Sequence, residues 1–326
     1  MKKLLALLLA LVVVGGVVFA QDAAPVSKVT GYFYNTSVLF NQDSKQVAGP
    51  DWLSAGHYGN IGFSYAAKEF GFSGTIEFEN AAVNSAFRDY TAWVKPFGDI
   101  LKVSAGKLRN GDYRLTSYVD GSGFNTRLAN AEYGYMIQAY PVAGLSLGFF
   151  NNVTTTATAP DMKVLGFGAS YTITDIAKLV VAYKGSLDEL FIGADIKAVK
   201  GLTAKLGFVN DSTTGADFNR IWATAGYALM DGALDLGLDA YYKMETTTTV
   251  NTLWAKVQAA YTIGNITPSV YFDIKNVSSP AATTEDVGAQ LKFAAGDNGA
   301  LYLGVDVGLG GATTTWSVPL TVEVSF

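Results

Sequence analysis

Large apolar residues alternate with polar or small residues along almost the whole chain after residue 20. In the segment 202–208, for example, Leu206 and Phe208 occupy one set of alternate positions, and Thr203 and Lys205 occupy the other. Because successive side chains of a strand point to opposite faces, this pattern predicts β-strands with one apolar and one water-facing side. The apolar face is free of charge in fifteen such segments: 61–65, 70–78, 133–139, 145–149, 165–171, 179–183, 190–196, 202–208, 221–229, 234–242, 253–261, 266–274, 287–293, 301–309 and 316–326.

Three weaker segments, at 29–40, 87–95 and 101–108, bring the number of predicted strands to eighteen. Arg88 falls among the apolar positions of its segment, and we therefore expect it at a rim of the sheet. A miscounted hairpin would remove two strands, so sixteen is the alternative. Short turns alternate with longer polar loops, as in an up-and-down barrel. The predicted fold is all-β: a single antiparallel transmembrane β-barrel of 16–18 strands.

The composition supports strands that face lipid. The mean hydropathy is +0.22 and only 16% of the residues are charged, yet no segment after residue 20 approaches the roughly 18 consecutive apolar residues of a helical span. A charge that faces hydrocarbon costs about 2–4 kcal/mol at mid-membrane. Fifteen charge-free faces therefore indicate contact with lipid.

The last strand shows the clearest alternation. Its apolar positions are Trp316, Val318, Leu320, Val322, Val324 and Phe326. An apolar strand at an open sheet edge invites aggregation, whereas a closed barrel has no edge. This strand resembles that of outer-membrane β-barrel proteins, whose assembly machinery reads a C-terminal strand with a final Phe. The resemblance implies insertion into the lipid of the outer membrane, with short periplasmic turns and longer external loops.

The N-terminus and the residue counts narrow the function further. Two lysines precede an apolar run at 4–14, and Ala20 ends a suitable cleavage site, so we expect a signal peptide at 1–20 and one barrel domain at 21–326. The chain has no Cys, and His57 is its single His, which excludes thiolate and His-rich metal sites. We expect no cofactor. The net charge of −5 disfavours nucleic acid as a partner.

If the apolar faces contact lipid, the alternate positions face the interior. The candidate lumen-facing residues are Lys102, Lys205, Arg220, Asp235, Asp239, Lys256, Asp273, Lys292 and Asp306. Charges of both signs on one enclosed face require water, and a barrel of sixteen to eighteen strands leaves an aqueous channel. All such positions together carry ten basic and twelve acidic residues. This small excess of negative charge predicts a weak cation preference.

The longest predicted loop, 110–129, follows the fifth predicted strand and concentrates charge. The candidate pore-constriction residues in or beside it are Arg109, Asp112, Arg114, Asp120 and Arg127. This loop order and charge type resemble those of Gram-negative diffusion porins, in which the loop after the fifth strand folds into the lumen and narrows it. The resemblance implies a water-filled channel for passive diffusion of ions and small hydrophilic solutes, and a homotrimer.

Two other functions remain open. Aromatic residues also occupy lumen positions, which resembles the sugar path of sugar-type specific channels, although they equally suit the rims: Trp93, Trp222, Trp254, Tyr241, Tyr271 and Tyr302. A non-conducting barrel that acts as an adhesin or a structural protein would also use long polar loops, but it needs no wide, charged lumen.

An enzyme is disfavoured. Asp51, Ser54 and His57 could be drawn as a catalytic triad, but catalysis needs a locked mutual geometry, and polar residues that cluster in a loop are common. The sequence contains no Gly-x-Ser-x-Gly motif, phosphate-binding loop or metal motif. We therefore predict no catalytic residues.

Overall fold

The computed structural model describes residues 25–41, 47–48, 57–79, 86–153, 164–213, 217–246, 250–278, 283–310 and 314–326. The expected signal peptide at 1–20 lies outside the described residues. So do Asp51, Ser54 and the side chain of His57, three residues that could be drawn as a triad.

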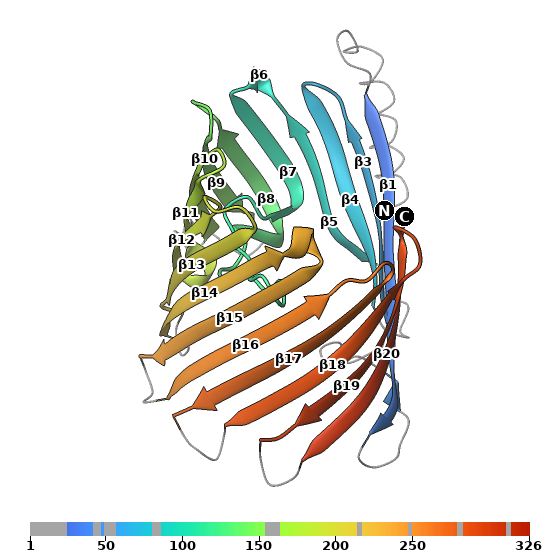
Figure 1. Cartoon of the computed structure of the whole chain (residues 1–326). Helices are drawn as coiled ribbons and strands as arrows, with labels where there is room; N and C mark the ends of the chain where they lie inside the picture. Colours follow the sequence, from blue (N-terminus) through green and yellow to red (C-terminus); the bar gives the residue numbers. More distant parts are fainter. Residues whose placement is uncertain are drawn as a thin grey trace.

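Eighteen long antiparallel strands form one closed barrel in the described part of the chain (Figure 1). Each strand pairs with its neighbours in chain order, and the first strand pairs with the last. This confirms the predicted all-β barrel and the count of eighteen. The strands are β1 (Val26–Asn41), β3 (His57–Ala66), β4 (Phe70–Glu79), β5 (Ala86–Val94), β7 (Leu101–Asn110), β8 (Ala129–Ala139), β9 (Leu145–Asn152), β10 (Leu165–Ile173), β11 (Ala177–Lys184), β12 (Glu189–Ile196), β13 (Leu202–Asp211), β14 (Phe218–Leu229), β15 (Leu234–Glu245), β16 (Asn251–Tyr261), β17 (Ile266–Val277), β18 (Thr284–Ala294), β19 (Gly299–Gly308) and β20 (Thr315–Ser325).

The described parts of the connections contain four short elements. They are β2 (Val47–Ala48), which pairs with β1, β6 (Pro96–Asp99) between β5 and β7, and two 3-10 turns, η2 (Gly185–Leu187) and η3 (Met230–Gly232). The short turn between β3 and β4 lies at the same end of the barrel as β6 (Figure 1). Within the described ranges, no helix is long and apolar enough to cross a membrane.

The two faces of each strand differ as the alternation predicts. On β16, Leu253 and Val257 are 49% and 46% exposed on the outer surface, whereas Trp254 and Lys256 interact with lumen residues of neighbouring strands. Large exposed apolar side chains recur on the barrel strands from β1 to β20. An apolar exterior around a charged interior is the arrangement that a lipid environment requires.

The barrel closes where β1 meets β20, with Phe33 opposite Val324. The backbone N–H of Phe326 donates to the carbonyl of Gly31 at 3.0 Å, and the N–H of Gly31 donates back at 2.8 Å. The Phe326 ring lies directly over Gly31, where a Cβ would come within 2.1 Å of the ring. A Cβ at this position would therefore require the terminal ring to move.

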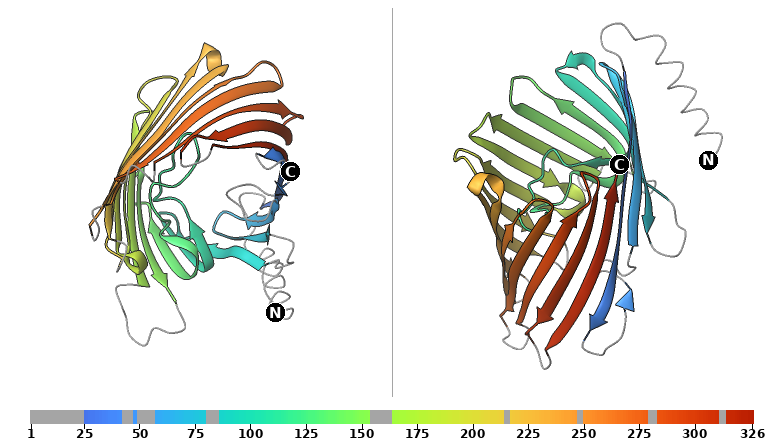
Figure 2. Two further views of the ribbon diagram at one scale, coloured as in Figure 1. Left: turned by 90° about the horizontal axis from the view of Figure 1, so that it is seen from below. Right: turned by 45° about the vertical axis from the view of Figure 1, so that its right-hand side comes forward.

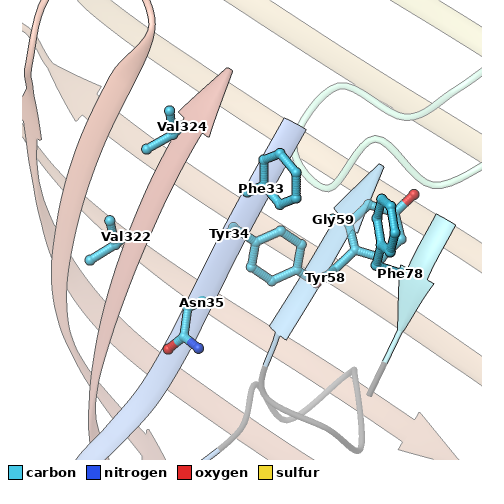
Figure 3. A pocket seen from close by; sticks show the side chains of 8 residues that line it. All are labelled: Phe33, Tyr34, Asn35, Tyr58, Gly59, Phe78, Val322 and Val324. Atoms are coloured by element: carbon cyan, nitrogen blue, oxygen red, sulfur yellow. The ribbon is translucent and has the colours of Figure 1, made fainter. Parts of the chain in front are cut away.

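An apolar groove of about 310 Å³ lies beside this closure (Figure 3). The ring of Phe33 covers Gly59, where a Cβ would lie 2.3 Å from it, and stacks on Phe78 with 6.5 Å between ring centroids. Val322 and Val324 of β20 line the other side. The closure is therefore packed by side chains as well as by the backbone ladder.

Arg88, the third residue of β5, lies in a local irregularity of the sheet. The register of β4 and β5 shifts between the pairs Thr75–Asp89 and Ile76–Phe87, so Arg88 is an extra residue in a β-bulge. Its guanidinium donates to Asp89 at 2.7 Å and also bonds the inward-facing Tyr58 and Glu77. The bulge turns a residue of the apolar parity into the lumen.

Candidate functional site in the barrel lumen

The connection between β7 and β8, residues 111–128, lies inside the ring of strands (Figure 2). It forms a narrow turn in which the N–H of Ser117 donates to the carbonyl of Ser122 at 2.8 Å, and that of Phe124 to Leu115 at 2.9 Å. Its apolar side chains Tyr113, Leu115, Phe124 and Leu128 are at most 4% exposed. We call this segment the lumen loop.

Three cross-strand pairs of glycines on the inner wall make room for the lumen loop. The pairs are Gly148–Gly168, Gly193–Gly207 and Gly226–Gly237. A Cβ at Gly148 or Gly168 would lie 2.4 Å from the Tyr113 ring, and one at Gly226 would lie 2.2 Å from the Tyr118 ring. Over the middle pair, Leu115 and Phe124 of the loop share the space with the ring of Phe191 on β12. The wall and the loop are therefore complementary in shape, and larger wall residues would clash with the loop.

Hydrogen bonds fasten the lumen loop to successive strands. The Tyr113 hydroxyl bonds Ser146 of β9 at 2.8 Å. On β12, Glu189 accepts from the N–H of Thr126 at 2.8 Å and from its hydroxyl at 3.0 Å. The ammonium group of Lys205 on β13 donates to the carbonyl of Thr116 at 2.8 Å. The loop thus follows the inner wall from β8 toward β15.

The tip of the lumen loop is held by one carboxylate. Asp239 of β15 is fully buried and accepts from the backbone N–H groups of Tyr118 (3.0 Å), Val119 (3.0 Å) and Asp120 (3.1 Å). The hydroxyl of Thr224 also bonds Asp239. Three converging N–H groups satisfy a buried charge that would otherwise be costly.

A tyrosine makes a second contact at the tip. The Tyr118 hydroxyl donates to Asp235 at 2.7 Å. Burial, with the hydrogen bond and charge of Asp235, raises the pKa of Tyr118 to about 12. The hydroxyl therefore keeps its proton, and its hydrogen bond, throughout the neutral range.

Two of the predicted constriction residues are half-buried in the lumen loop. Arg114 lies between the wall-packed Tyr113 and Leu115, and its Nε donates to the carbonyl of Asn125 at 3.0 Å. Arg127 directly precedes the wall-packed Leu128. Burial and then the charge of Arg114 lower the pKa of Arg127 to about 10, and Arg109 and Arg88 add to this effect.

The predicted acidic residues of the lumen loop are engaged locally. The side-chain amide of Gln138 on β8 donates to Asp112 at 2.7 Å. Asp120 accepts from the N–H of Ser122 at 2.7 Å and from the hydroxyl of Ser117. Asp112 and Asp120 therefore take part in hydrogen bonds that hold the shape of the loop.

Other predicted lumen residues contact one another on the inner wall. The hydroxyl of Tyr271 donates to Asp306 at 2.8 Å, and the Lys256 ammonium lies 4.6 Å from the Tyr271 ring centroid. The same kind of contact joins Lys292 to Tyr302 at 5.4 Å and Lys102 to Trp93 at 5.5 Å. Asp273 lies opposite Lys256 in the ladder.

Aromatic rings form a stacked row beside the loop. Phe124 of the loop stacks on Trp222 at 5.2 Å, Trp222 contacts Tyr241 at 4.7 Å, and Tyr241 stacks on Trp254 at 5.4 Å. The guanidinium of Arg220 lies over the Tyr241 ring at 5.1 Å. We call Trp222, Tyr241 and Trp254 the aromatic row. Trp222 is 5% exposed, so the other two rings present the accessible surface.

Sequence reasoning missed the glycine pairs, although a signal was present. Glycines at lumen positions of neighbouring strands indicate that something packs against the wall there. A charged residue among apolar positions, such as Arg88, indicates a β-bulge as readily as it indicates a position at the rim. Within the described residues, no group of three or more metal-ligating side chains could hold a metal ion.

Comparison with known proteins defines the fold. No family model matches the chain, and no curated protein matches it. Among solved structures, the chain is similar to Pseudomonas aeruginosa OccK10 (TM-score 0.60, 11% identity, covering 92% of this chain and 99% of that one). It is also similar to the P. aeruginosa outer membrane protein OpdK (0.59, 12%, 93% and 98%) and to a mutant of the Rh. blastica porin (0.53, 14%, 92% and 100%). The fold is that of outer-membrane porins along almost the whole chain.

Proposed function

We propose that this protein is an outer-membrane porin, a water-filled channel through which ions and small hydrophilic solutes diffuse passively. The observation that carries the proposal is a closed barrel of eighteen strands with an apolar exterior and charged residues of both signs on its inner wall. A barrel of this size leaves an aqueous channel. The proposal includes no catalytic step and no cofactor.

The lumen loop is the proposed constriction. We propose that Arg109, Asp112, Arg114, Asp120 and Arg127, which lie in or beside this loop, line the narrowest part of the channel. The fit of the loop to the glycine pairs of the wall supports this proposal. A fixed, charged constriction selects solutes by diameter and orients polar ones in its field. Fastening the tip through Asp239 gives such a constriction a constant width.

The proposed route to the membrane uses both ends of the chain. A signal peptide at 1–20 would direct export, and the outer-membrane assembly machinery would read the strand that ends at Phe326. On β20, Trp316, Val322 and Val324 point outward and are 39–48% exposed. A homotrimer in outer-membrane lipid completes the proposal.

Liposome swelling tests passive diffusion directly. Liposomes that contain the refolded chain, without residues 1–20, should swell in solutions of small neutral sugars, at rates that fall as the sugar becomes larger. Protein-free liposomes are the control. If liposomes that contain folded protein swell as little as protein-free liposomes, the result contradicts an open channel.

A substrate-specific channel is the second candidate, and the aromatic row favours it. Aromatic faces suit stacking against sugar rings or aromatic solutes, and Tyr241 and Trp254 present a stacked pair beside the lumen loop. One similar structure is that of OpdK with vanillate (TM-score 0.58, 11% identity). Concentration-dependent block of the current by an oligosaccharide, weakened in Trp254→Ala, would favour this candidate over a general pore.

A further inference from the structure

The ladder between β5 and β7 ends before either strand does. It consists of five residue pairs and stops at Tyr90–Lys107. Both strands continue beyond that pair, because β4 pairs with β5, and β8 with β7, up to the ends of the two strands. Among the described residues, 86–89 of β5 and 108–110 of β7 therefore lie in the wall without pairing with each other. We call these two ranges the unpaired seam.

Three neighbouring strands are irregular where this pairing ends. Arg88 is the extra residue of the β-bulge on β5. On β7, Gly106 has a φ of 138°, and a Cβ there would lie 2.3 Å from the backbone oxygen of Tyr90. On β8, Ala131 has a φ of 60° at the point where the register with β7 shifts. Since bulges bend strands and end their pairing, the backbone of all three strands favours the separation of β5 from β7.

A lysine lies on the outer face beside the seam. Lys107 is directly opposite Tyr90 and Tyr133, which are 37% and 55% exposed on the outer surface, and opposite residues share a face of the sheet. A charge among lipid-facing positions is costly unless water reaches it. The ammonium group of Lys107 donates to the backbone carbonyl of Phe87 at 2.9 Å. This bond joins the two strands beyond their last pair.

The two faces of the seam differ in chemistry. Outside, the rings of Phe87, Tyr90 and Tyr133 contact one another edge to face, with 6.1 and 6.3 Å between centroids. Inside, Arg88 and Asp89 form an ion pair at 2.7 Å. Backbone that leaves a regular ladder at membrane depth needs protein or water against it, because lipid offers no hydrogen bonds. An aromatic outer side and a charged inner side suit an amphipathic molecule.

We propose that the unpaired seam is a lateral opening between the lumen and the lipid, and that amphipathic solutes with one apolar tail pass through it. The tail would contact the aromatic rings at the outer face, and the polar head would hydrogen-bond to Arg88 and Asp89. β6 lies in the short connection at the other end of β5 and β7. Short connections are expected on the periplasmic side, so the opening leads to the outer leaflet. This route is additional to the axial diffusion of hydrophilic solutes.

Access of lipid to the lumen side of the seam tests the opening. The chain has no Cys, so Asp89→Cys provides one attachment site for a fluorophore on the inner wall. Asp273→Cys is the matched control, because Asp273 also faces the lumen but is paired on both sides, with Lys256 and Asp286. In liposomes whose acyl chains carry a nitroxide quencher, we expect the label at position 89 to lose fluorescence and the label at position 273 to keep it.

A disulfide measures the separation of the two strands. Asp89 and Leu108 would form the next pair, facing inward, if the ladder continued, whereas Trp93 and Ser104 form an inward-facing pair within it. Disulfides need Cα atoms within about 7 Å of each other. We therefore expect oxidation to cross-link W93C with S104C and to leave D89C with L108C largely reduced. Complete cross-linking of the seam pair in the folded protein would overturn the opening.

Octyl glucoside tests the solute class, with glucose as the control for its head group. Below its critical micelle concentration, the amphiphile should reduce the open-channel current of the refolded protein, whereas glucose at the same concentration should not. Joining D89C to L108C through a longer bifunctional thiol reagent should abolish this effect. The same treatment of W93C with S104C should preserve it.

The outcomes separate the two proposals. Equal quenching at positions 89 and 273 overturns the opening. An octyl glucoside effect that is absent, or that survives bridging of the seam, overturns the passage of amphipathic solutes. Folded protein that carries no current overturns the porin proposal, while quenching and cross-linking still decide whether the seam is open.

Discussion

Asp239 shows how a single residue can position a whole segment. It is fully buried, and its carboxylate accepts three backbone N–H groups from the tip of the lumen loop. Hydrogen bonds to an ionised acceptor are stronger than neutral ones. Because the donors are backbone groups, the contact depends on the path of the loop and little on its side chains.

Replacing Asp239 by Ala should release the loop tip. The three N–H groups lose their acceptor, so we expect the free energy of unfolding to fall by about 1.5–3 kcal/mol, with more open-channel noise. Urea unfolding and single-channel recording measure the two effects. Asp286→Ala on β18 is the matched control, since it removes a carboxylate that the loop does not contact, and a similar effect there would contradict the role of Asp239.

At the scale of elements, shape complementarity joins strands that are distant in the sequence. Six glycines on β9, β10, β12, β13, β14 and β15 line up across the ladder and receive the side chains of one loop. The barrel wall there has two functions, because its outer face meets lipid while its inner face holds the loop.

A single added methyl group tests that fit. Gly226→Ala would place a Cβ 2.2 Å from the Tyr118 ring, whereas Gly166→Ala would place one at an ordinary 3.5 Å from Leu128. We expect G226A to destabilise the protein by about 1–3 kcal/mol and to change the channel conductance, and G166A to do neither. Urea midpoints and conductance steps distinguish them, and identical behaviour would mean that the loop does not depend on the glycine.

The closure of the barrel gives a prediction about assembly. Phe326 covers Gly31 and stacks on Phe33 with 6.3 Å between ring centroids. Phe326→Ala should therefore lower the fraction of protein that folds into the outer membrane. Phe40→Ala at the other end of β1 is a matched control, since both rings are 58% exposed. Equal yields of the two variants would argue against a special role for the terminal ring.

At the scale of the whole molecule, alternation alone predicted the barrel. Fifteen charge-free faces fixed which side of each strand meets lipid, because a slip by one residue would bury charges in hydrocarbon. The path of the lumen loop was harder to predict from the sequence. Its length and arginines were visible, but its contacts with Ser146, Glu189 and Asp239 join residues far apart in sequence, which only the closed barrel brings together.

Single-channel conductance of the refolded mature chain in a planar bilayer, at moderate and high salt, tests the central claim most directly. An eighteen-strand barrel with a wet lumen should give steady open steps whose size increases with salt concentration. Folded protein that inserts into the bilayer without conducting would contradict the porin, and a structural or adhesive barrel would then be the better account.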